Sequence, residues 1–324
     1  MMTTEERVAW LAERRKGIGG SDAAKVMNAS PWGGPHKVWM DKVGLAEEEK
    51  QTEAMDMGLE AENLVAKKYA KKMKIDYSQI ISVPMSRTSA IIDGVPLVAN
   101  YDRIVVDEEG RWLYGVELKT ASFRKASDGW GEEGTDQVPP HYMFQCQHYL
   151  MTSGLKRWDL AVSFGWRYPI IYHIYRNERL IKAMQKRYAE FWGLVTTKEP
   201  PPVDGSEDAK NMLNKLYPGQ KESSAQASPE IDELVHEYRQ KKSLLALRQG
   251  ELDETINSIK ELMQDTEVIY GPDSEYTIRW KASMQGRTSW LDIVDELSIK
   301  DEVIKRHTKK TKTARKFTIN FPKE

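Results

Sequence analysis

The chain has 324 residues, of which 40% are hydrophobic and 30% are charged, enough for a sizeable core. Its 48 basic and 49 acidic residues leave a formal net charge of −1, a balance that neither indicates nor excludes a nucleic-acid partner. The single cysteine, Cys146, excludes a disulfide framework or a cysteine-held zinc or iron–sulfur cluster within one chain. The sequence contains no run of 18 apolar residues and no signal-peptide core, so we expect a cytoplasmic protein without a membrane partner.

The N-terminal region combines two predicted helices with a glycine-rich connection. Residues 3–16 are expected to form the first helix, and the glycines of segment 17–20 a flexible loop that leads into the second, with Ser21 as its N-cap. A glycine loop before a helix N-terminus offers N–H groups and a positive dipole end, which suit a phosphate. Arg14, just upstream, could add charge-assisted hydrogen bonds. An ordinary helix–turn–helix connection would produce the same pattern.

Two more helices and two strands are predicted before residue 97. A short helix is expected near residues 37–43 and a long one over residues 54–74, which carries both Glu60 and Glu62. Residues 79–85 and 89–93 have the composition of strands.

Residues 97–120 are predicted to form a β-hairpin around a turn at residues 107–110. The hairpin would bring Asp102 on its first strand near Glu117 and Lys119 on its second, and the last two would share a face because side chains alternate along a strand. Two carboxylates and a lysine on one face can hold hard divalent cations such as Mg²⁺ and position a water. A surface hairpin with a solvated charge pair is the alternative. The apolar neighbours of Glu117 and Lys119 disfavour it, because an unpaired charge in a half-buried strand is costly.

The next segment is expected to be a loop over residues 121–138, a helix from the prolines at 139 and 140 to Ser153, strands at 157–165 and 168–176, and a helix at 177–195. Prolines at 200–202 mark a boundary. We therefore divide the chain into a domain over residues 1–203, a linker over residues 204–228 in which 207–217 could form a short helix, and an extension over residues 229–324.

The extension is predicted to be mainly helical. Residues 229–265 form a long helix or helical pair with a heptad-like apolar stripe, which suits intramolecular packing or self-association. A hairpin is expected over 267–283, a helix near 290–306 and a strand at 317–321. The basic residues between 305 and 316 could contact DNA or form a solvated tail.

Five sequence blocks stand in a characteristic order. They are Trp10-x3-Arg14-x3-Ile18-Gly-Gly-Ser21-Asp22, Gly58-x3-Glu62, Asp102, Glu117-Leu-Lys119 and Tyr142-x2-Gln145-Cys-Gln147. Together they resemble the YqaJ-type viral recombinases, a family that includes the lambda-type phage exonucleases and belongs to the PD-(D/E)XK nuclease superfamily. The resemblance covers roughly residues 8–195. It implies an α/β fold with a restriction-endonuclease-like core, in which helices flank a central mixed sheet.

The resemblance also implies roles for individual residues. The catalytic set would be Glu62, Asp102, Glu117, Lys119 and Gln145. Mg²⁺, for which Mn²⁺ could substitute, would be bound by Asp102, Glu117 and the backbone carbonyl of Leu118. Contacts to the 5′-phosphate and DNA would come from Arg14, Ser21, Asn100 and Tyr142, although Asn100 stands where the lambda-type protein has a serine.

The implied activity is a Mg²⁺-dependent 5′→3′ exonuclease that acts on double-stranded DNA ends and leaves 3′ single-stranded tails for an annealing protein. The resemblance and the apolar stripe together favour a homo-oligomer, with a trimeric ring around DNA as the expected form. If the chain is phage-encoded, its compartment would be the host cytoplasm. The competing interpretations are a Cas4- or RecB-like nuclease, of which the first usually needs four cysteines, and a non-catalytic DNA-binding assembly module on the same fold.

Overall fold

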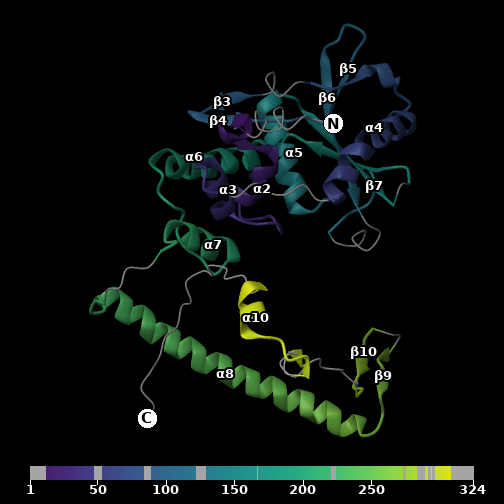
Figure 1. The fold of residues 1–324 in the computed structure, drawn as a ribbon. Coiled ribbons are helices and arrows are strands. Elements are labelled where there is room, and N and C mark those ends of the chain that lie inside the picture. Colours follow the sequence, from purple (N-terminus) through teal and green to yellow (C-terminus); the bar gives the residue numbers. More distant parts are fainter. Residues whose placement is uncertain are drawn as a thin grey trace. The chain divides into compact units, whose positions relative to one another are not determined.

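The computed structural model describes residues 12–46, 53–83, 89–121, 129–165, 167–219, 224–272, 275–282, 289–290, 293 and 296–307. Its contacts divide the chain into two compact units, Met1–Pro218 and Gly219–Glu324, and each is considered by itself (Figure 1).

A five-stranded sheet in the order β2-β5-β6-β7-β8 forms the centre of the first unit. Its strands are β2 (Ile80–Ile81), β5 (Arg103–Val106), β6 (Trp112–Ala121), β7 (Arg157–Phe164) and β8 (Ile170–Tyr175). The pair β6–β7 is parallel and the other neighbours are antiparallel, so the sheet is mixed. The expected fold class, an α/β core with a central mixed sheet between helices, is confirmed.

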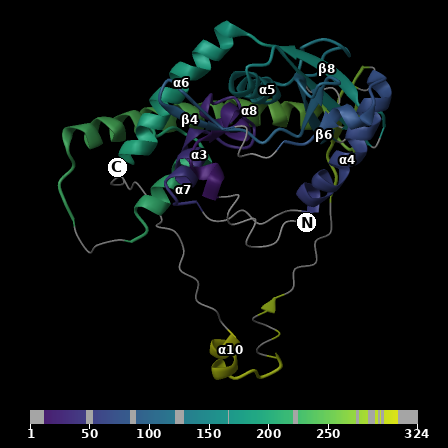
Figure 2. The same cartoon turned by 90° about the horizontal axis from the view of Figure 1, so that it is seen from above.

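Helices cover both faces of this sheet (Figures 1 and 2). On one face, α4 (Glu53–Met73) packs Val65 and Tyr69 against strand side chains such as Val116 and Leu118 of β6. On the other face, α5 (Pro140–Ser153), which connects the parallel strands β6 and β7, packs through Leu150 and its buried neighbours. Alternation along β6 therefore directs one set of its side chains to α4 and the other set to α5.

The predicted hairpin over residues 97–120 is too long, because its first residues belong to a second sheet. This second sheet has the order β1-β4-β3, with β1 (Ile18–Gly19) parallel and β3 (Ala90–Ile92) antiparallel to β4 (Val95–Val98). The hairpin itself is formed by β5 and β6 alone. The chain thus leaves one sheet after Val98 and enters the other at Arg103, so Asp102 lies just before a strand and not on it.

The glycine-rich segment before the second helix is also more ordered than expected, because Ile18 and Gly19 pair with β4. Helix α2 (Gly20–Val26) begins at Gly20, and its N-cap residue is Gly19. The prediction that Ser21 is the N-cap is therefore wrong. The backbone N–H of Gly19 instead donates to Oδ2 of Asp22 at 3.0 Å, so the aspartate satisfies this helix end. Of the predicted helix 3–16, residues 12–15 are helical and 1–11 lie outside the described part.

Four helices share one hydrophobic core with the second sheet, and Met151 of α5 also contributes to it. They are α2, α3 (Pro35–Lys42), α6 (Glu178–Thr197) and α7 (Glu207–Leu216). Helix α7 falls within the segment 204–228 that the sequence predicts as a linker, but its Met212 is fully buried in this core. Its Asp208 also accepts a hydrogen bond from the Gly34 N–H at the start of α3, at 2.8 Å. The first unit consequently includes α7. A short 3-10 helix, η1 (Tyr77–Gln79), precedes β2.

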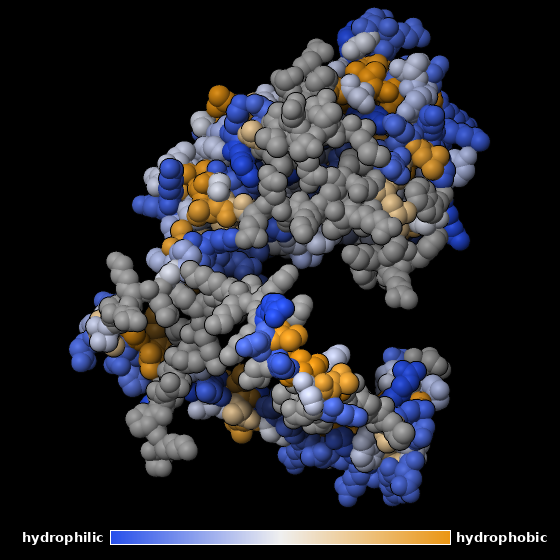
Figure 3. Space-filling model, in the orientation of Figure 1, coloured by the Kyte–Doolittle hydropathy of each residue, from blue (hydrophilic) through white to orange (hydrophobic). Residues whose placement is uncertain are grey.

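The described part of the second unit is mainly helical, as expected. Helix α8 (Pro229–Met263) spans 35 residues and begins where the Ser228 side chain accepts a hydrogen bond from the Ile231 N–H. It is followed by the antiparallel pair β9 (Val268–Tyr270) and β10 (Thr277–Arg279), and by α10 (Asp301–His307). The unit exposes hydrophobic side chains among hydrophilic ones (Figure 3). The predicted strand 317–321 and most of the basic run lie outside the described residues.

Within the described segments, we find no helix with both the length and the apolar character that crossing a bilayer requires.

Candidate active site

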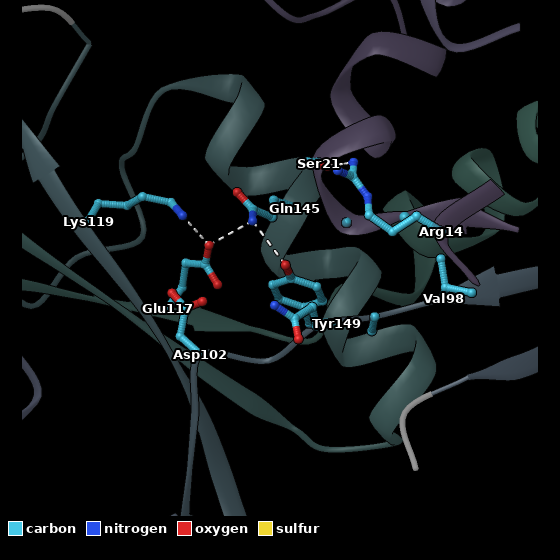
Figure 4. A pocket seen from close by; sticks show the side chains of 12 residues that line it. Arg14, Ser21, Val98, Asp102, Glu117, Lys119, Gln145 and Tyr149 are labelled. Atoms are coloured by element: carbon cyan, nitrogen blue, oxygen red, sulfur yellow. Dashed lines mark hydrogen bonds and ion pairs between the residues drawn. The ribbon is translucent and has the colours of Figure 1, made fainter. Parts of the chain in front are cut away.

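Strand β6 presents Glu117 and Lys119 on the α5 side of the sheet, as the alternation predicts (Figure 4). Glu117 is almost completely buried, at 1% exposure, and its Oε1 forms an ion pair with Nζ of Lys119. Between them, Leu118 points to the opposite face and packs with α4. The rigid strand therefore fixes the spacing of the acid and the lysine.

Asp102 reaches the same place from the short crossing between the two sheets. Its Oδ2 accepts a hydrogen bond from the Leu118 N–H at 2.8 Å, so the carboxylate takes the place of a backbone acceptor where the β5–β6 ladder stops. The two carboxylates lie close enough for Asp102 to raise the pKa of Glu117. Asp102 and Glu117 thus meet although they are not paired residues of one hairpin.

Helix α5 contributes Gln145 to this cluster. Its Nε2 donates to Oε1 of Glu117 at 2.7 Å and to the hydroxyl of Tyr149 at 3.0 Å (Figure 4). The other glutamine of the motif, Gln147, is buried and lies elsewhere. It donates to the Tyr175 carbonyl and accepts from the Asn177 N–H, which fixes the turn between β8 and α6. Gln145 therefore belongs to the site and Gln147 to the scaffold.

The pKa values of Glu117 and Lys119 are shifted by burial and by their charged neighbours. Burial and the nearby Asp102 raise the pKa of Glu117, although Lys119 opposes them. Burial alone would lower the pKa of Lys119, but the two carboxylates hold it above its usual range. The lysine is consequently a permanent positive charge beside two acids in a poorly solvated site.

Glu62 lies on α4, at the edge of the same site. Its carboxylate is 4.0 Å from the guanidinium of Arg103, and burial and Asp102 raise its pKa. It is absent from the residues that line the pocket around Glu117. The structure thus brings Glu62 near Asp102 but not into the cavity.

Arg14 and Ser21 line this same cavity, although Arg14 precedes β1 and Ser21 lies on α2, far along the chain from β6 (Figure 4). Nη2 of Arg14 donates to Oγ of Ser21 at 2.9 Å. The cavity has a volume of about 170 Å³ and is lined by Arg14, Gly19, Gly20, Ser21, Val98, Ala99, Asn100, Asp102, Glu117, Lys119, Gln145 and Tyr149. One pocket is therefore lined by both carboxylates of the predicted metal site, Asp102 and Glu117, and by three of the four predicted phosphate and DNA contacts, Arg14, Ser21 and Asn100.

The remaining two predicted contacts differ in position. Asn100 lines the cavity and is exposed. Tyr142 does not line it; its ring packs against Trp130 at 5.3 Å and His141 at 4.1 Å between ring centroids. Burial raises the pKa of Tyr142.

Three residues to which the sequence analysis gave no role contribute to this site, although Asp22 stands in the first sequence block. Tyr149 accepts the hydrogen bond from Gln145 and lies against Gly20, where a Cβ would come within 2.3 Å of its ring. Its spacing of four from Gln145 on one helix face is a signal that could have identified it. Asp22 and Lys42 lie behind Arg14 as a buried ion pair at 2.7 Å. No local pattern marks Lys42.

The donor set fits a hard divalent cation. Oε2 of Glu117 is buried without a hydrogen-bond partner, an arrangement that a cation would resolve. Carboxylate and main-chain oxygens are the ligands that Mg²⁺ prefers, and Asp102, Glu117 and the Leu118 carbonyl could supply them. Over the described ranges, no group of three or more His, Cys, Asp and Glu side chains is arranged around a possible metal position. The metal roles of these three residues remain predictions.

Comparisons with known proteins agree with the order of the sequence blocks. Residues 9–156 match the model of the YqaJ-like viral recombinase domain. The chain is 31% identical over 311 residues to the uncharacterized protein YqaJ of Bacillus subtilis (strain 168), which corresponds to 93% of this chain and 92% of that protein.

Among solved structures, the alkaline exonuclease of Laribacter hongkongensis is similar over 64% of this chain and 99% of its own, with 18% identity and a TM-score of 0.45. A structure of the same exonuclease in complex with dAMP gives 18% identity and a TM-score of 0.46.

Proposed function

Because the chain belongs to the YqaJ-like viral recombinase family, we propose that it is a Mg²⁺-dependent exonuclease that degrades one strand of duplex DNA from its 5′ end. The 3′ single-stranded tail that remains would serve homologous recombination through a strand-annealing protein.

One observation carries this proposal: the acids, lysine and glutamine at one end of a single pocket, with an arginine and a serine at the other. The first group suits hydrolysis of a phosphodiester, which develops negative charge on the attacked phosphate and the leaving oxygen. The second suits a phosphate that is bound and not cleaved. A pocket with both groups can hold a terminal phosphate while the next bond along the strand is cut.

Each side chain at the acidic end has a separate task. Asp102, Glu117 and the Leu118 carbonyl would hold the ion, and Gln145 keeps Glu117 in place through the 2.7 Å hydrogen bond to Oε1. Lys119 carries a permanent charge that would position the attacking water and balance the two carboxylates. A bound divalent ion supplies an activated water and neutralises the leaving oxyanion.

Polarity would come from the basic end of the pocket. Arg14 provides a fork of donors, Ser21 a hydroxyl in the first turn of α2, and Gly19 and Gly20 a close approach to the backbone. A terminal phosphomonoester carries more charge than an internal diester, so this end should favour a 5′-phosphorylated strand.

The test is digestion of a linear duplex in which one strand carries a fluorophore at its 3′ terminus, so that removal from the 5′ end yields progressively shorter labelled products. We expect a ladder of shortening that depends on Mg²⁺ or Mn²⁺ and stops with EDTA. Release of the labelled terminal nucleotide first would indicate the opposite polarity. Binding of duplex ends without any metal-dependent cleavage would favour the non-catalytic assembly module.

A further inference from the structure

Behind the basic end of the pocket lies a lysine whose side chain is completely buried. The side chain of Lys42, in the last turn of α3, is 0% exposed. Its Nζ lies 2.7 Å from Oδ2 of Asp22 and donates to the carbonyl oxygen of Arg14 at 2.9 Å. Burying an ammonium group is costly unless it is paired and hydrogen-bonded. The contacts with Asp22 and with the Arg14 carbonyl meet both conditions for Lys42.

Its partner, Asp22, lies between two cations. Oδ2 of Asp22 contacts Lys42, while Oδ1 is 3.8 Å from Nη2 of Arg14. Burial opposes ionisation of this carboxyl, but Lys42 and Arg14 together hold its pKa below the usual range. Asp22 is consequently an anion, and its nearer cation is Lys42.

Only one of the two cations reaches the pocket. The Arg14 side chain is 27% exposed and lines the cavity, whereas Lys42 does not line it. Arg14, Asp22 and Lys42 together carry one net positive charge, and Arg14 is the cation of the three that lines the cavity. A second acid near Lys42, Asp41, lies 3.6 Å from it and has a closer cation in Arg15 at 3.3 Å.

We propose that Lys42 is a positioning residue that determines end specificity: by pairing with Asp22, it leaves the charge of Arg14 available for a terminal phosphomonoester. The inference deepens the proposed function and rests on it, because it takes the Arg14 end of the pocket as the site of the 5′-phosphate. Without Lys42 the cluster carries no net charge. Asp22 then pairs with Arg14, and an incoming phosphate meets a neutral ion pair with a carboxylate behind it.

The experiment compares the affinity of a 5′-phosphorylated duplex with that of the same duplex ending in a 5′-hydroxyl. Fluorescence anisotropy in EDTA measures both without cleavage. The wild type should prefer the phosphate, and Lys42→Met should reduce that preference roughly tenfold, the size of a lost hydrogen bond to a charged group. Lys37→Met, the same substitution earlier on α3 and outside the pocket lining, should leave the preference unchanged.

A second variant separates charge pairing from simple structural support. Asp22→Asn combined with Lys42→Met removes both charges of the buried pair, and the amide oxygen of the new side chain can still accept from the Gly19 N–H. Because the Asp22 carboxylate no longer draws on the charge of Arg14, the double variant should regain most of the phosphate preference. Removing both partners of a buried ion pair is also far less disruptive than removing one. The double variant thus tests the inference even where Lys42→Met alone fails to fold.

The outcomes distinguish this inference from the function on which it rests. A preference that is intact in Lys42→Met, or absent in the double variant, overturns the role of Lys42 while the digestion assay still supports the nuclease. Equal affinity of the wild type for the two ends overturns both the phosphate pocket and this inference. A wild type that does not digest DNA with Mg²⁺ overturns the proposed function, whichever end it prefers to bind.

Discussion

At the scale of single residues, the site depends on two side chains whose removal should act on chemistry and not on packing. Asp102 is half-buried and Lys119 is partly exposed, with 28% of its side chain accessible. We expect Asp102→Ala and Lys119→Ala each to abolish cleavage, because one loses a proposed metal ligand and the other the cation proposed to position the water. Digestion rate and melting temperature should be measured on the same preparations. Near-normal turnover in either folded variant would contradict the assignment.

Side chains that share a face of one strand are easier to predict from sequence than contacts between different elements. Glu117 and Lys119 were found from sequence because two positions on one strand share a face wherever the strand lies. Strand alternation could not separate Gln145 from Gln147. The family resemblance singled out Gln145, and the physical distinction depends on what α5 packs against. Lys42 could not be found at all: its burial arises only when α2, α3 and the segment around Arg14 come together.

At the scale of elements, hydrophobic periodicity identified most helices and strands of the first unit, including α4, α5, α6 and the strands around them. The errors lie where tertiary pairing decides. Ile18 and Gly19 look like a loop but pair with β4, and the apparent hairpin strand 97–106 is divided between two sheets. Asp102 lies at that division, where the Leu118 N–H bonds to a side chain and not to a strand.

Helix α5 also contains a histidine that should make stability depend on pH. Nε2 of His148 contacts the Val98 carbonyl of β4 at 3.0 Å, and Nδ1 contacts the Tyr188 hydroxyl of α6 at 3.2 Å. Burial lowers its pKa to about 4, while the more distant Asp22 and Lys42 oppose one another. Because the folded pKa lies below that of the unfolded chain, the contribution is complete above about pH 6.5 and is lost as the pH falls toward 4.

The free energy of unfolding in urea should therefore fall by about 2 to 3 kcal/mol more in the wild type than in His148→Gln between about pH 7 and pH 4.5, since one unit of pKa is about 1.4 kcal/mol. Other acids titrate equally in both proteins, so the difference isolates the histidine. Parallel pH profiles for the two proteins would refute its titration in this window.

The basic run between Lys305 and Lys316 is a separate element, of which the structure describes only the end of α10. We expect it to add nonspecific affinity for DNA, because each phosphate contact releases counterions. Replacing its lysines and arginines with glutamine should flatten the slope of log affinity against log salt. The slope is measured by titrating labelled duplex at several salt concentrations. An unchanged slope would show that this run does not contact DNA.

At the scale of the whole molecule, α8 leaves an apolar stripe that favours self-association. Its exposed members recur every seventh residue and include Leu245 and Leu252, at 69% and 52% exposure. A heptad repeat of this kind suits a partner helix with the same period. We therefore expect a homo-oligomer, with a trimer as the specific expectation, and a ring of subunits would slow dissociation between cuts.

Sedimentation at micromolar concentration, with and without DNA, checks this expectation. Leu245→Glu with Leu252→Glu should lower the association state, whereas Ser243→Glu, an exposed position outside the stripe, should not. A monomer under both conditions would contradict the ring.

The molecule should distinguish the two ends of a strand through one end of its pocket. The proposed metal site at the Asp102 and Glu117 end cannot do so, because a phosphodiester presents similar oxygens to it from either direction. The Arg14 end can, since only a terminus carries the additional charge of a phosphomonoester. We therefore expect the wild type to digest 5′-phosphorylated duplex faster than 5′-hydroxyl duplex, and Arg14→Ala to lose most of that difference while retaining metal-dependent cleavage. The measurement is the ratio of initial rates on the two substrates. Equal rates in the wild type, or a full preference in Arg14→Ala, would place the phosphate pocket elsewhere.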